Sequence, residues 1–446
     1  MPENRTLAVA AGGTFLVLIA FTTPLATLAS TAAGLSAGPG GQAWILSSMC
    51  VGLAVALLVS GAIADDYGRR KVMVAGSALL ALTSMLAAAA PNTVVLVVAR
   101  IGQGIGGAAI LSCSLGLIAH AFPAGPARAR ATGIWGAAVG AGIAVGPLAM
   151  GALDEAGSWR AGYWLLAALS VVLVVAARTA LVESHVDTPR PVDVLGASVL
   201  GGGLVALLAG LVEGRQEWTR PVVIILFAAA AVLLAAFAVW EGRTRAPMLE
   251  LNLFRRPEFV ASIAAGTATG AGIIALMSFT PTFLQRAFHY STFEAALLLL
   301  AWSATSAVVA LLARRLPAAL SVRLRLVLSL LLIAVGQLLL TADTSAIDLL
   351  PGLLVAGVGS GVLNAALGQI AVTSVPAGKA SVGSGANNTA RYVGAAVGIT
   401  VVAVIATRGD LLSGYGTAAL VTAALSAVGA VLVLVTGIRT RAPVAA

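Results

Sequence analysis

Long apolar stretches separated by short polar joints are the dominant pattern along this chain. Each stretch is long enough to cross the hydrocarbon core of a bilayer as a helix, which takes about 20 residues. A bilayer core leaves no water for backbone groups, so continuous apolar segments of this length predict helices. The pattern predicts an all-α polytopic membrane protein with 14 transmembrane helices. The predicted spans are 7–33, 42–64, 72–91, 93–121, 131–153, 161–180, 194–212, 221–240, 259–285, 293–312, 326–342, 348–373, 382–407 and 415–438.

Composition supports this class and narrows the partners. Hydrophobic residues make up 59% of the chain, charged residues make up 10%, and the mean hydropathy is +1.01. Soluble domains carry about 25% charged residues. The net charge of +9 is spread over short runs between apolar segments rather than one stripe, so no nucleic-acid partner is predicted. Cys50 and Cys113 lie inside apolar stretches, away from any metal-ligand pattern, and no metal or cofactor is predicted.

The distribution of basic residues predicts the orientation in the membrane. With both termini in the cytoplasm, 19 of the 26 Lys and Arg residues fall in cytoplasmic joints and five fall outside. The remaining two, Arg100 and Arg391, lie within spans. Cytoplasmic loops of membrane proteins carry an excess of Lys and Arg. The sequence therefore predicts a multi-pass protein of the cell inner membrane with cytoplasmic termini.

Two long polar breaks divide the chain into blocks. Residues 181–193 and 241–258 are the longest breaks, and they bracket one helical pair at 194–240. The predicted domains are an N-terminal six-helix bundle over 1–180, cytoplasmic linkers with the inserted pair over 181–258, and a C-terminal six-helix bundle over 259–446.

The two six-helix blocks share a short internal repeat. Residues 98–109 read VARIGQGIGGAA and residues 355–366 read VAGVGSGVLNAA, and each is followed by a Pro-Ala-Gly turn. Related bundles with a substrate site at their interface are a known plan of transporters. Gly357 stands where the first copy has Arg100, so packing of the repeat does not by itself require that arginine.

The joint at 61–71, GAIADDYGRRK, combines a small residue, an acid, a turn glycine and a basic run. Glycine allows close approach of helices and tight turns, and an acid can pair at a helix end. The segment resembles the major facilitator superfamily signature between the second and third spans, and the resemblance implies a gating latch at the cytoplasmic face. The residues concerned are Gly61, Asp65, Gly68, Arg69, Arg70 and Lys71.

Residues 96–107, LVVARIGQGIGG, resemble a second motif of that family. An arginine inside a span costs about 2.5–3.5 kcal/mol on insertion scales, so it needs partners or a wet cavity. We expect Arg100, Gln103 and Arg391 to serve in the cavity or in coupling. The alternative for Arg100 is a structural arginine satisfied by backbone carbonyls.

The fifth span contains GAAVGAGIAVGPLAMG at 136–151, which is similar to the antiporter motif of drug-efflux members. Small residues let another helix pack closely, and an internal proline favours a kink. The motif residues are Gly142, Gly146, Pro147 and Gly151, and Met150 departs from the usual glycine. With its central helix pair, the chain resembles the fourteen-span drug:proton antiporter branch. That resemblance implies export of small molecules, a proton as coupling ion, and a monomer in contact with membrane lipid.

The chain departs from that branch at the coupling acid. The usual first-span acid would fall near Ala20 to Thr22, where none is present, and no Asp, Glu or His is predicted at mid-membrane. Arginine effectively does not deprotonate, and Arg100 and Arg391 would attract anions. The favoured hypothesis is an alternating-access exporter of amphipathic compounds that are anionic or neutral.

Two other hypotheses stay open. One is a broad cationic multidrug:proton antiporter whose coupling acid lies near a gate, at Asp65, Glu213 or Glu294. The other is a membrane protein that senses a ligand or handles lipid without pumping. No catalytic acid, base or metal cluster is visible in the spans, so no enzymatic activity is predicted.

In the family, the spans equivalent to one, four, nine and twelve line the cavity. Candidates from these spans and from spans ten and thirteen are Thr22, Thr23, Phe279, Trp302, Asn364, Gln369 and Asn388.

Overall fold

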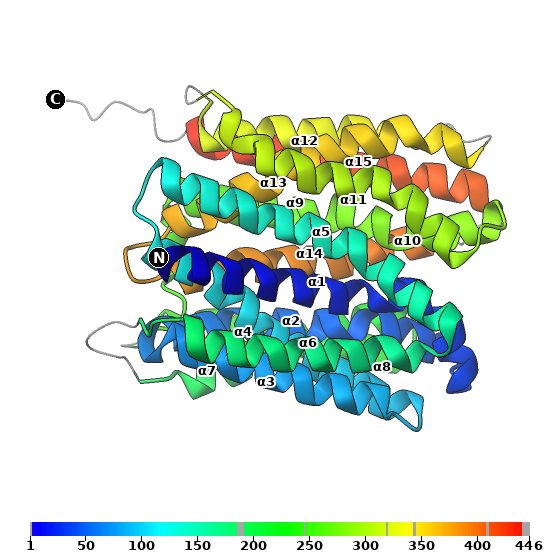
Figure 1. Ribbon diagram of the computed structural model, residues 1–446, viewed down its shortest axis with the longest axis horizontal. Coiled ribbons are helices and arrows are strands. Elements are labelled where there is room, and N and C mark those ends of the chain that lie inside the picture. The colour runs from blue at the N-terminus through cyan, green and yellow to red at the C-terminus, as the bar shows by residue number, and fades with distance from the viewer. Residues whose placement is uncertain are drawn as a thin grey trace.

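The computed structural model describes residues 2–184, 191–244, 247–317, 320–341, 345–406 and 410–438, and within these ranges the chain is helical and forms no strand. Fourteen of its helical segments are long and apolar enough to cross a membrane, which confirms the predicted number of spans. The long helices lie side by side along one direction (Figure 1).

The helices extend a few residues beyond most of the predicted boundaries. The first six are α1 (Pro2–Gly34), α2 (Pro39–Tyr67), α3 (Arg69–Ala88), α4 (Thr93–Ala121), α5 (Pro126–Ala156) and α6 (Trp159–Ala180). The central pair is α7 (Val194–Gly214) and α8 (Pro221–Glu241). The last six spans comprise α9 (Pro257–Thr269), η2 (Gly270–Ile274) and α10 (Ala275–Ala287), which together form one span, and then α11 (Thr292–Leu312), α12 (Val322–Leu339), α13 (Leu350–Thr373), α14 (Ala380–Ala406) and α15 (Leu411–Ile438).

Local sequence explains where several helices begin. Asn92 and Ser291 accept hydrogen bonds from backbone N–H groups of the first turns of α4 and α11. A side-chain oxygen at this position satisfies a donor that the helix itself leaves free. Proline occupies the first turn of α2, α5, α8 and α9, where its missing N–H removes no helical hydrogen bond.

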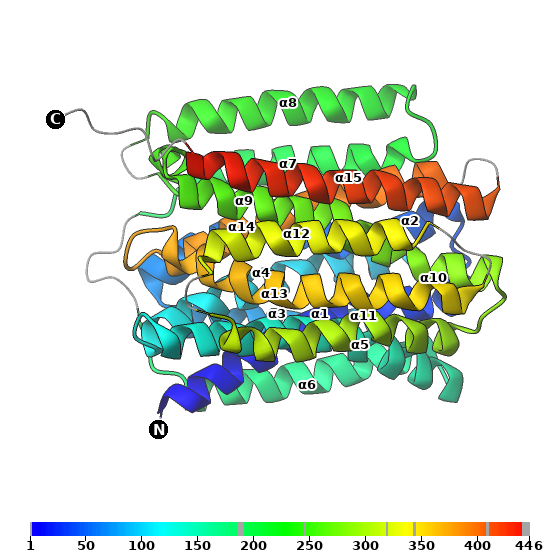
Figure 2. The same cartoon turned by 90° about the horizontal axis from the view of Figure 1, so that it is seen from above.

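The central pair lies at the side of the molecule, across the seam between the two blocks. Helix α7 packs against α2 and also against α14, and α8 packs against α7 (Figure 2). Only 17% of the most apolar window of α8 is buried. An apolar helix surface that no other helix covers is suited to contact with lipid. The central pair is therefore peripheral, and α7 contacts both blocks.

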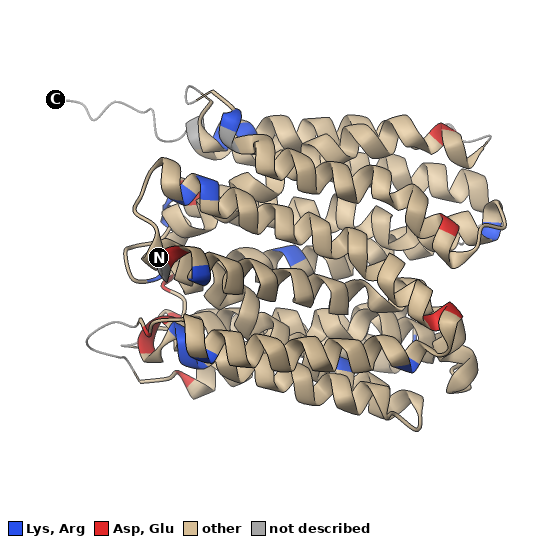
Figure 3. Cartoon of the chain, in the orientation of Figure 1, with Lys and Arg blue, Asp and Glu red and all other residues tan. Residues whose placement is uncertain are grey.

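The two blocks meet along α2 and α14 on one side and along α5, α11 and α13 on the other. Glycines make these contacts close: a Cβ at Gly61 would collide with the Ser381 carbonyl, and one at Gly140 would lie 2.8 Å from the Ala307 nitrogen. Most Lys and Arg side chains gather at the end that carries the N-terminus, and few charges lie midway along the helices (Figure 3). We call the N-terminal end the latch end.

Both Pro-Ala-Gly turns of the repeat lie at the latch end and have the same backbone feature. Gly125 and Gly378 each adopt positive φ, at 114° and 88°. L-residues with a side chain rarely adopt this conformation, so a glycine in this place has a physical reason in both copies.

Candidate functional site

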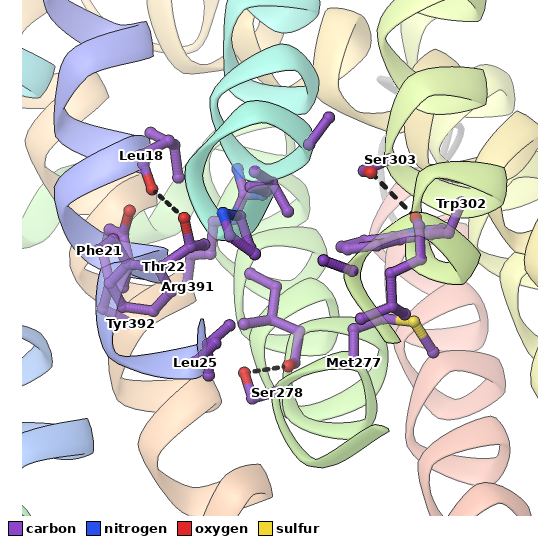
Figure 4. Close-up of a pocket in the computed structure, with 16 residues that line it drawn as sticks. Leu18, Phe21, Thr22, Leu25, Met277, Ser278, Trp302, Ser303, Arg391 and Tyr392 are labelled. Atoms are coloured by element: carbon purple, nitrogen blue, oxygen red, sulfur yellow. Dashed lines mark hydrogen bonds between the residues drawn. The ribbon is translucent and has the colours of Figure 1, made fainter. Parts of the chain in front are cut away.

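The main cavity lies between the two blocks and is bounded by α1, α5, η2, α10, α11 and α14. The space free of protein atoms in and around it amounts to about 600 Å³, part of which is open to solvent. Its apolar lining residues are Leu18, Phe21, Leu25, Ile143, Ala144, Pro147, Ile274, Met277, Ala296 and Leu299. Phe21 and Tyr392 lie beside Arg391 on one side, with Met277 and Trp302 opposite (Figure 4).

The polar lining residues are Thr22, Ser278, Trp302, Ser303, Arg391 and Tyr392. The three hydroxyl groups of Thr22, Ser278 and Ser303 donate to carbonyls of their own helices, at 2.9, 2.7 and 2.9 Å. Trp302 Nε1 donates to Ser360 Oγ at 3.0 Å. Among the described residues, no Asp, Glu or His lines this cavity, and Arg391 is the one charged residue of its lining.

A smaller cavity of about 300 Å³ adjoins the first and runs deeper between α5, η2, α11 and α13. Ile143, Ile274, Trp302, Ser303 and Arg391 line both spaces. Asn364 lines the smaller one, where its Nδ2 lies 3.5 Å from Ser306 Oγ. Arg391 therefore stands where the two spaces meet.

The wall facing Arg391 includes a π-helical turn, η2, within the ninth span. Single π-helical turns inside α-helices are frequently found at functional sites. A Cβ at Gly270 would collide with the Arg391 carbonyl, so η2 packs directly on the backbone of α14. Ile274, the last residue of η2, lines both cavities.

Arg391 is the twelfth of the 27 residues of α14 and is only 5% exposed. Its Nε is fully buried without a hydrogen-bond partner, and across the described ranges no acidic side chain pairs with it. Tyr392 beside it makes an edge-to-face contact with Phe21, at 5.5 Å between ring centroids. The sequence-based expectation that Arg391 serves in the cavity stays a prediction, and its position among the lining residues supports it.

Arg100 lies elsewhere, inside the first six helices, and is fully buried. Its guanidinium donates to the carbonyls of Ile45 at 3.2 Å, Ala20 at 3.0 Å and Phe21 at 3.5 Å, and to Gln103 Oε1 at 3.2 Å. Gln103 in turn donates to Ser84 Oγ at 2.9 Å. Neither Arg100 nor Gln103 lines the cavities just described, so this geometry favours the structural alternative for Arg100.

Proline explains one of the acceptors of Arg100. Pro24 lies inside α1 and has no N–H, so the carbonyl four residues earlier, that of Ala20, lacks its usual helical donor. The guanidinium of Arg100 supplies that donor. Pro24 thus leaves a carbonyl of α1 without a donor, and the buried Arg100 of α4 uses that carbonyl as an acceptor.

The other predicted cavity residues are distributed unevenly. Thr22 and Trp302 line the main cavity and Asn364 the smaller one. Thr23 donates to the Ile19 carbonyl and Asn388 to the Ser384 carbonyl, and neither lines these two spaces. Phe279 also lies outside their lining and packs against the core of the last six spans. Gln369 lines a separate space of about 300 Å³ toward the latch end.

Asp65 connects the two blocks at the latch end. Its carboxylate accepts hydrogen bonds from the backbone N–H groups of Ser381 at 3.2 Å and Val382 at 2.9 Å, in the first turn of α14. It also pairs with Arg69, whose Nη2 lies 2.6 Å from Oδ1. A carboxylate at a helix N-terminus satisfies free donors and interacts favourably with the helix dipole.

Arg69 extends the same latch. Its Nη2 donates to the Gly378 carbonyl at 2.9 Å, and its Nε donates to Ser381 Oγ at 3.2 Å. Gly68, between α2 and α3, has φ of 126°, a conformation that favours glycine. We call Asp65, Arg69 and the residues of the 378–382 segment that they contact the Asp65 latch.

Arg70 and Lys71 take a different part at this end. Their backbone N–H groups donate to the carboxylate of Glu183, at 3.0 and 3.2 Å, so Glu183 caps α3. The Arg70 side chain donates to the Arg178 carbonyl at 2.7 Å, and Lys71 is exposed. No signal in the sequence marked Glu183, because it lies 112 residues beyond the motif in a polar joint.

The glycines of the antiporter motif differ in how tightly they pack. A Cβ at Gly142 would lie 2.7 Å from the Phe15 carbonyl, and one at Gly146 would collide with Thr22 Oγ1. At Gly151 the nearest atoms would be 3.8 Å away, which is ordinary contact. Gly142 and Gly146 hold α5 against α1, and Pro147 lines the main cavity.

The opposite end holds the remaining acids proposed as proton sites. Glu213 accepts a hydrogen bond from Trp44 Nε1 at 2.8 Å, and its other oxygen lies 3.5 Å from Arg220. Glu294 forms a capping box with Ser291 at the start of α11. Both lie at helix ends and outside the lining of the two cavities.

Arg215, two residues after Glu213, links the central pair to the last six spans. Its Nε donates to Thr400 Oγ1 of α14 at 3.1 Å. Burial lowers the pKa of its guanidinium to about 10, so it remains charged at neutral pH. At this end the central pair therefore contacts α2 through Glu213 and α14 through Arg215.

Comparison with known proteins agrees with this architecture. The model of the Major Facilitator Superfamily matches residues 10–399. The chain belongs to the major facilitator superfamily. Within it, the chain is 30% identical over 367 residues to the multidrug resistance protein Stp of Mycobacterium tuberculosis (strain CDC 1551 / Oshkosh), covering 82% of this chain and 68% of that protein.

A second sequence relative and one solved structure also match most of the chain. The tetracenomycin C resistance and export protein of Streptomyces glaucescens is 28% identical over 411 residues, covering 91% of this chain and 76% of that protein. The crystal structure of the human organic anion transporter MFSD10 (TETRAN) superposes with a TM-score of 0.71 at 18% identity, covering 97% of this chain and 100% of that one. At that identity the superposition shows the major facilitator fold alone, and it confirms the predicted fold class.

Several residues at the site were missed by the sequence analysis. Phe21, Tyr392, Met277 and the π-helical turn line or shape the main cavity. Only the Gly-Ala-Gly run at 270–272 carried a signal, because clustered glycines within a span often mark close packing. Contact with Arg391, from a helix more than 100 residues away, is not visible in any local pattern.

Proposed function

We propose that this protein is a secondary active exporter that works by alternating access and carries amphipathic small molecules, anionic or neutral, out of the cell. The observation that carries the proposal is the largely apolar cavity between two six-helix bundles, whose described lining residues include one arginine and no acid. The names of the relatives, which refer to multidrug resistance and to export, support the direction.

The geometry supports the following cycle. The bundles are residues 1–180 and 259–446, with 181–258 as linkers and inserted pair, in a monomer surrounded by lipid. The latch end, rich in Lys and Arg, is cytoplasmic, and the Asp65 latch holds it closed. Breaking the latch lets the bundles separate at this end and opens the cavity to the cytoplasm. In this proposal the protein lies in the inner membrane of a bacterium.

The test is transport by the purified protein in liposomes. Three probes are compared: naphthalene-1-sulfonate, its uncharged analogue naphthalene-1-sulfonamide, and the cation ethidium. We expect saturable movement of the sulfonate or the sulfonamide. Ala144→Phe, which fills the cavity from α5, should abolish transport, and Gly151→Ala on the same helix should not. Binding without movement of any probe would contradict an exporter and favour a sensor or lipid-handling protein.

A second candidate function is a cationic drug:proton antiporter. Among the acids proposed for proton coupling, Asp65 is the one whose contacts support this function. Its carboxylate bridges the bundles, so protonation would weaken the hydrogen bonds that it accepts from Ser381 and Val382. This candidate predicts that ethidium moves against a pH gradient and that Asp65→Asn removes the dependence on pH.

A further inference from the structure

Arg391 is a cation that, within the described residues, has no hydrogen-bond or acidic partner, and it borders a largely apolar cavity. It is 95% buried, and its Nε has no hydrogen-bond partner. Buried charges in proteins are normally paired or fully hydrogen-bonded, because removal from water is strongly unfavourable. Arg100 meets that requirement with four acceptors, and Arg391 has none in the part of the chain that the structure describes.

The neighbouring donors leave recognition to this arginine. The hydroxyls of Thr22, Ser278 and Ser303 already donate to carbonyls, and the Trp302 indole donates to Ser360. An acceptor group on a ligand therefore meets the guanidinium of Arg391 and the adjacent Tyr392. Guanidinium groups bind carboxylates, sulfonates and phosphates through paired N–H donors.

The rest of the cavity fits an apolar body attached to such a group. Phe21 and Tyr392 form one aromatic wall, and Trp302 with Met277 forms the facing wall. The backbone of Arg391 is held by Gly270, so the position of the charge relative to these walls is set by helix packing. A flat apolar monoanion satisfies both parts of the site.

We propose that Arg391 is an anion-binding subsite for an amphipathic monoanion, and that the membrane potential alone drives export of that anion. The inference rests on the alternating-access export proposed above, specifies its substrate class, and replaces coupling to a second ion with the membrane potential as the driving force. Within the described part of the chain, no Asp, Glu or His lines either cavity, and arginine keeps its proton. The described lining therefore offers no group to carry a coupling proton.

The physical reason for potential-driven export is the sign of the substrate. The cell interior is negative, so an anion that leaves moves down the electrical gradient. In each cycle the anion binds Arg391 from the cytoplasm and dissociates outside, and the empty carrier returns. One negative charge moves outward, and no second ion is needed.

The experiment uses liposomes containing the full chain, with naphthalene-1-sulfonate as the anion. A sulfonate stays ionised throughout the pH range used, so a pH gradient cannot act through the probe. Valinomycin with a tenfold potassium gradient sets the potential. We expect the sulfonate to distribute about tenfold across the membrane, because a monovalent anion equilibrates with the potential. A pH gradient at zero potential should leave the distribution even.

Binding measurements then test Arg391 itself. Arg391→Gln should weaken binding of the sulfonate at least tenfold and change binding of the matched sulfonamide less than twofold. Arg391→Lys should retain part of the sulfonate affinity. Arg286→Gln, the same substitution at an exposed arginine in the last turn of α10 and outside the lining of both cavities, is the matched control and should stay within twofold of the wild type for both probes.

A second variant keeps the test informative if Arg391→Gln does not fold. Ser303→Asp places a carboxylate in the lining shared with Arg391, and should lower sulfonate affinity and raise ethidium affinity. Sulfonate distribution that follows the pH gradient, or unchanged sulfonate binding in Arg391→Gln, would overturn the inference. Transport of the sulfonamide without the sulfonate would overturn it while the proposed exporter stands, and failure of every probe to move would overturn both.

Discussion

Two arginines buried in the membrane, Arg100 and Arg391, lie in opposite surroundings. Arg100 is enclosed by the first six helices, and its guanidinium donates to three backbone carbonyls and an amide oxygen. Arg391 belongs to the last six spans and borders the space between the blocks, without a partner for its Nε. The same residue type thus serves one helix bundle internally and faces a ligand space in the other.

The comparison teaches that the partners of a buried charge, rather than its depth, indicate its role. Both side chains are at least 95% buried. The acceptors of Arg100 include the Ala20 carbonyl, which Pro24 leaves without a helical donor, so this charge completes the structure of α1. Arg391 completes nothing within the described protein, which is the reason for our proposal that an anionic substrate is its partner.

The largest expected effect is a difference in stability between variants that replace the two arginines with leucine. Arg100→Leu removes donors from several buried carbonyls, each of which is unfavourable by about 1–3 kcal/mol when left unsatisfied, so we expect a loss on the order of 3 kcal/mol. Arg391→Leu removes an unpaired charge and should leave thermal stability unchanged or higher. Thermal unfolding of the purified variants, followed by size-exclusion chromatography, measures both. Equal destabilisation would break the comparison.

Arg69, a third buried arginine, extends the comparison because it has a carboxylate partner. Asp65→Asn weakens that pair and the capping of α14, which together contribute about 2 kcal/mol. We expect transport to fall at least tenfold and the latch end to open. Spin labels on Ala124→Cys and Ala377→Cys report the distance between the blocks; both positions are exposed and both native cysteines are buried. Glu294→Gln, at an exposed helix cap, is the control; an unchanged distance in Asp65→Asn would contradict the latch.

Helix α1 supplies acceptors to Arg100 and also lines the cavity that Arg391 borders. Its position depends on close packing against α5. Gly146→Ala should destabilise by about 1–3 kcal/mol, because the added methyl group overlaps Thr22 Oγ1. Gly151→Ala meets only atoms at 3.8 Å, and the better helix propensity of alanine should leave stability equal or slightly higher. We expect the unfolding temperature to fall in Gly146→Ala and to stay equal or rise slightly in Gly151→Ala, relative to the wild type. Equal shifts in the two variants would contradict this account.

The smallest effect tests the link between Pro24 and Arg100. Pro24→Ala supplies the missing N–H to the Ala20 carbonyl and so competes with the guanidinium. In a double-mutant cycle, Arg100→Leu should be less destabilising by about 1 kcal/mol in the Pro24→Ala background than in the wild type. Additive effects of the two substitutions would show that the proline and the arginine act independently.

Much of the fold could be predicted, because membrane spans are encoded locally. The fourteen apolar stretches were sufficient to predict the helices, and the Gly-Asp-Gly-Arg joint helped to predict the family to which the chain belongs. The contact of Asp65 with α14 agrees with a latch at this joint, whose gating role stays a prediction. The π-helical turn was not predicted, since η2 reads as part of one continuous apolar span. Glu183 was also missed, because a carboxylate that caps a different helix leaves no periodic pattern.

By itself, the sequence determined the number of spans, the family, and the presence of two arginines in a membrane with no acid beside them. These features follow from hydropathy, charge and motif spacing, all of which act over short stretches of chain. Only the tertiary structure decided that Arg100 is satisfied while Arg391 is not. The reason is that hydrogen-bond partners come from helices distant in sequence: Ala20 and Ile45 reach Arg100, whereas Gly270 and Trp302 approach Arg391 without an acceptor for it.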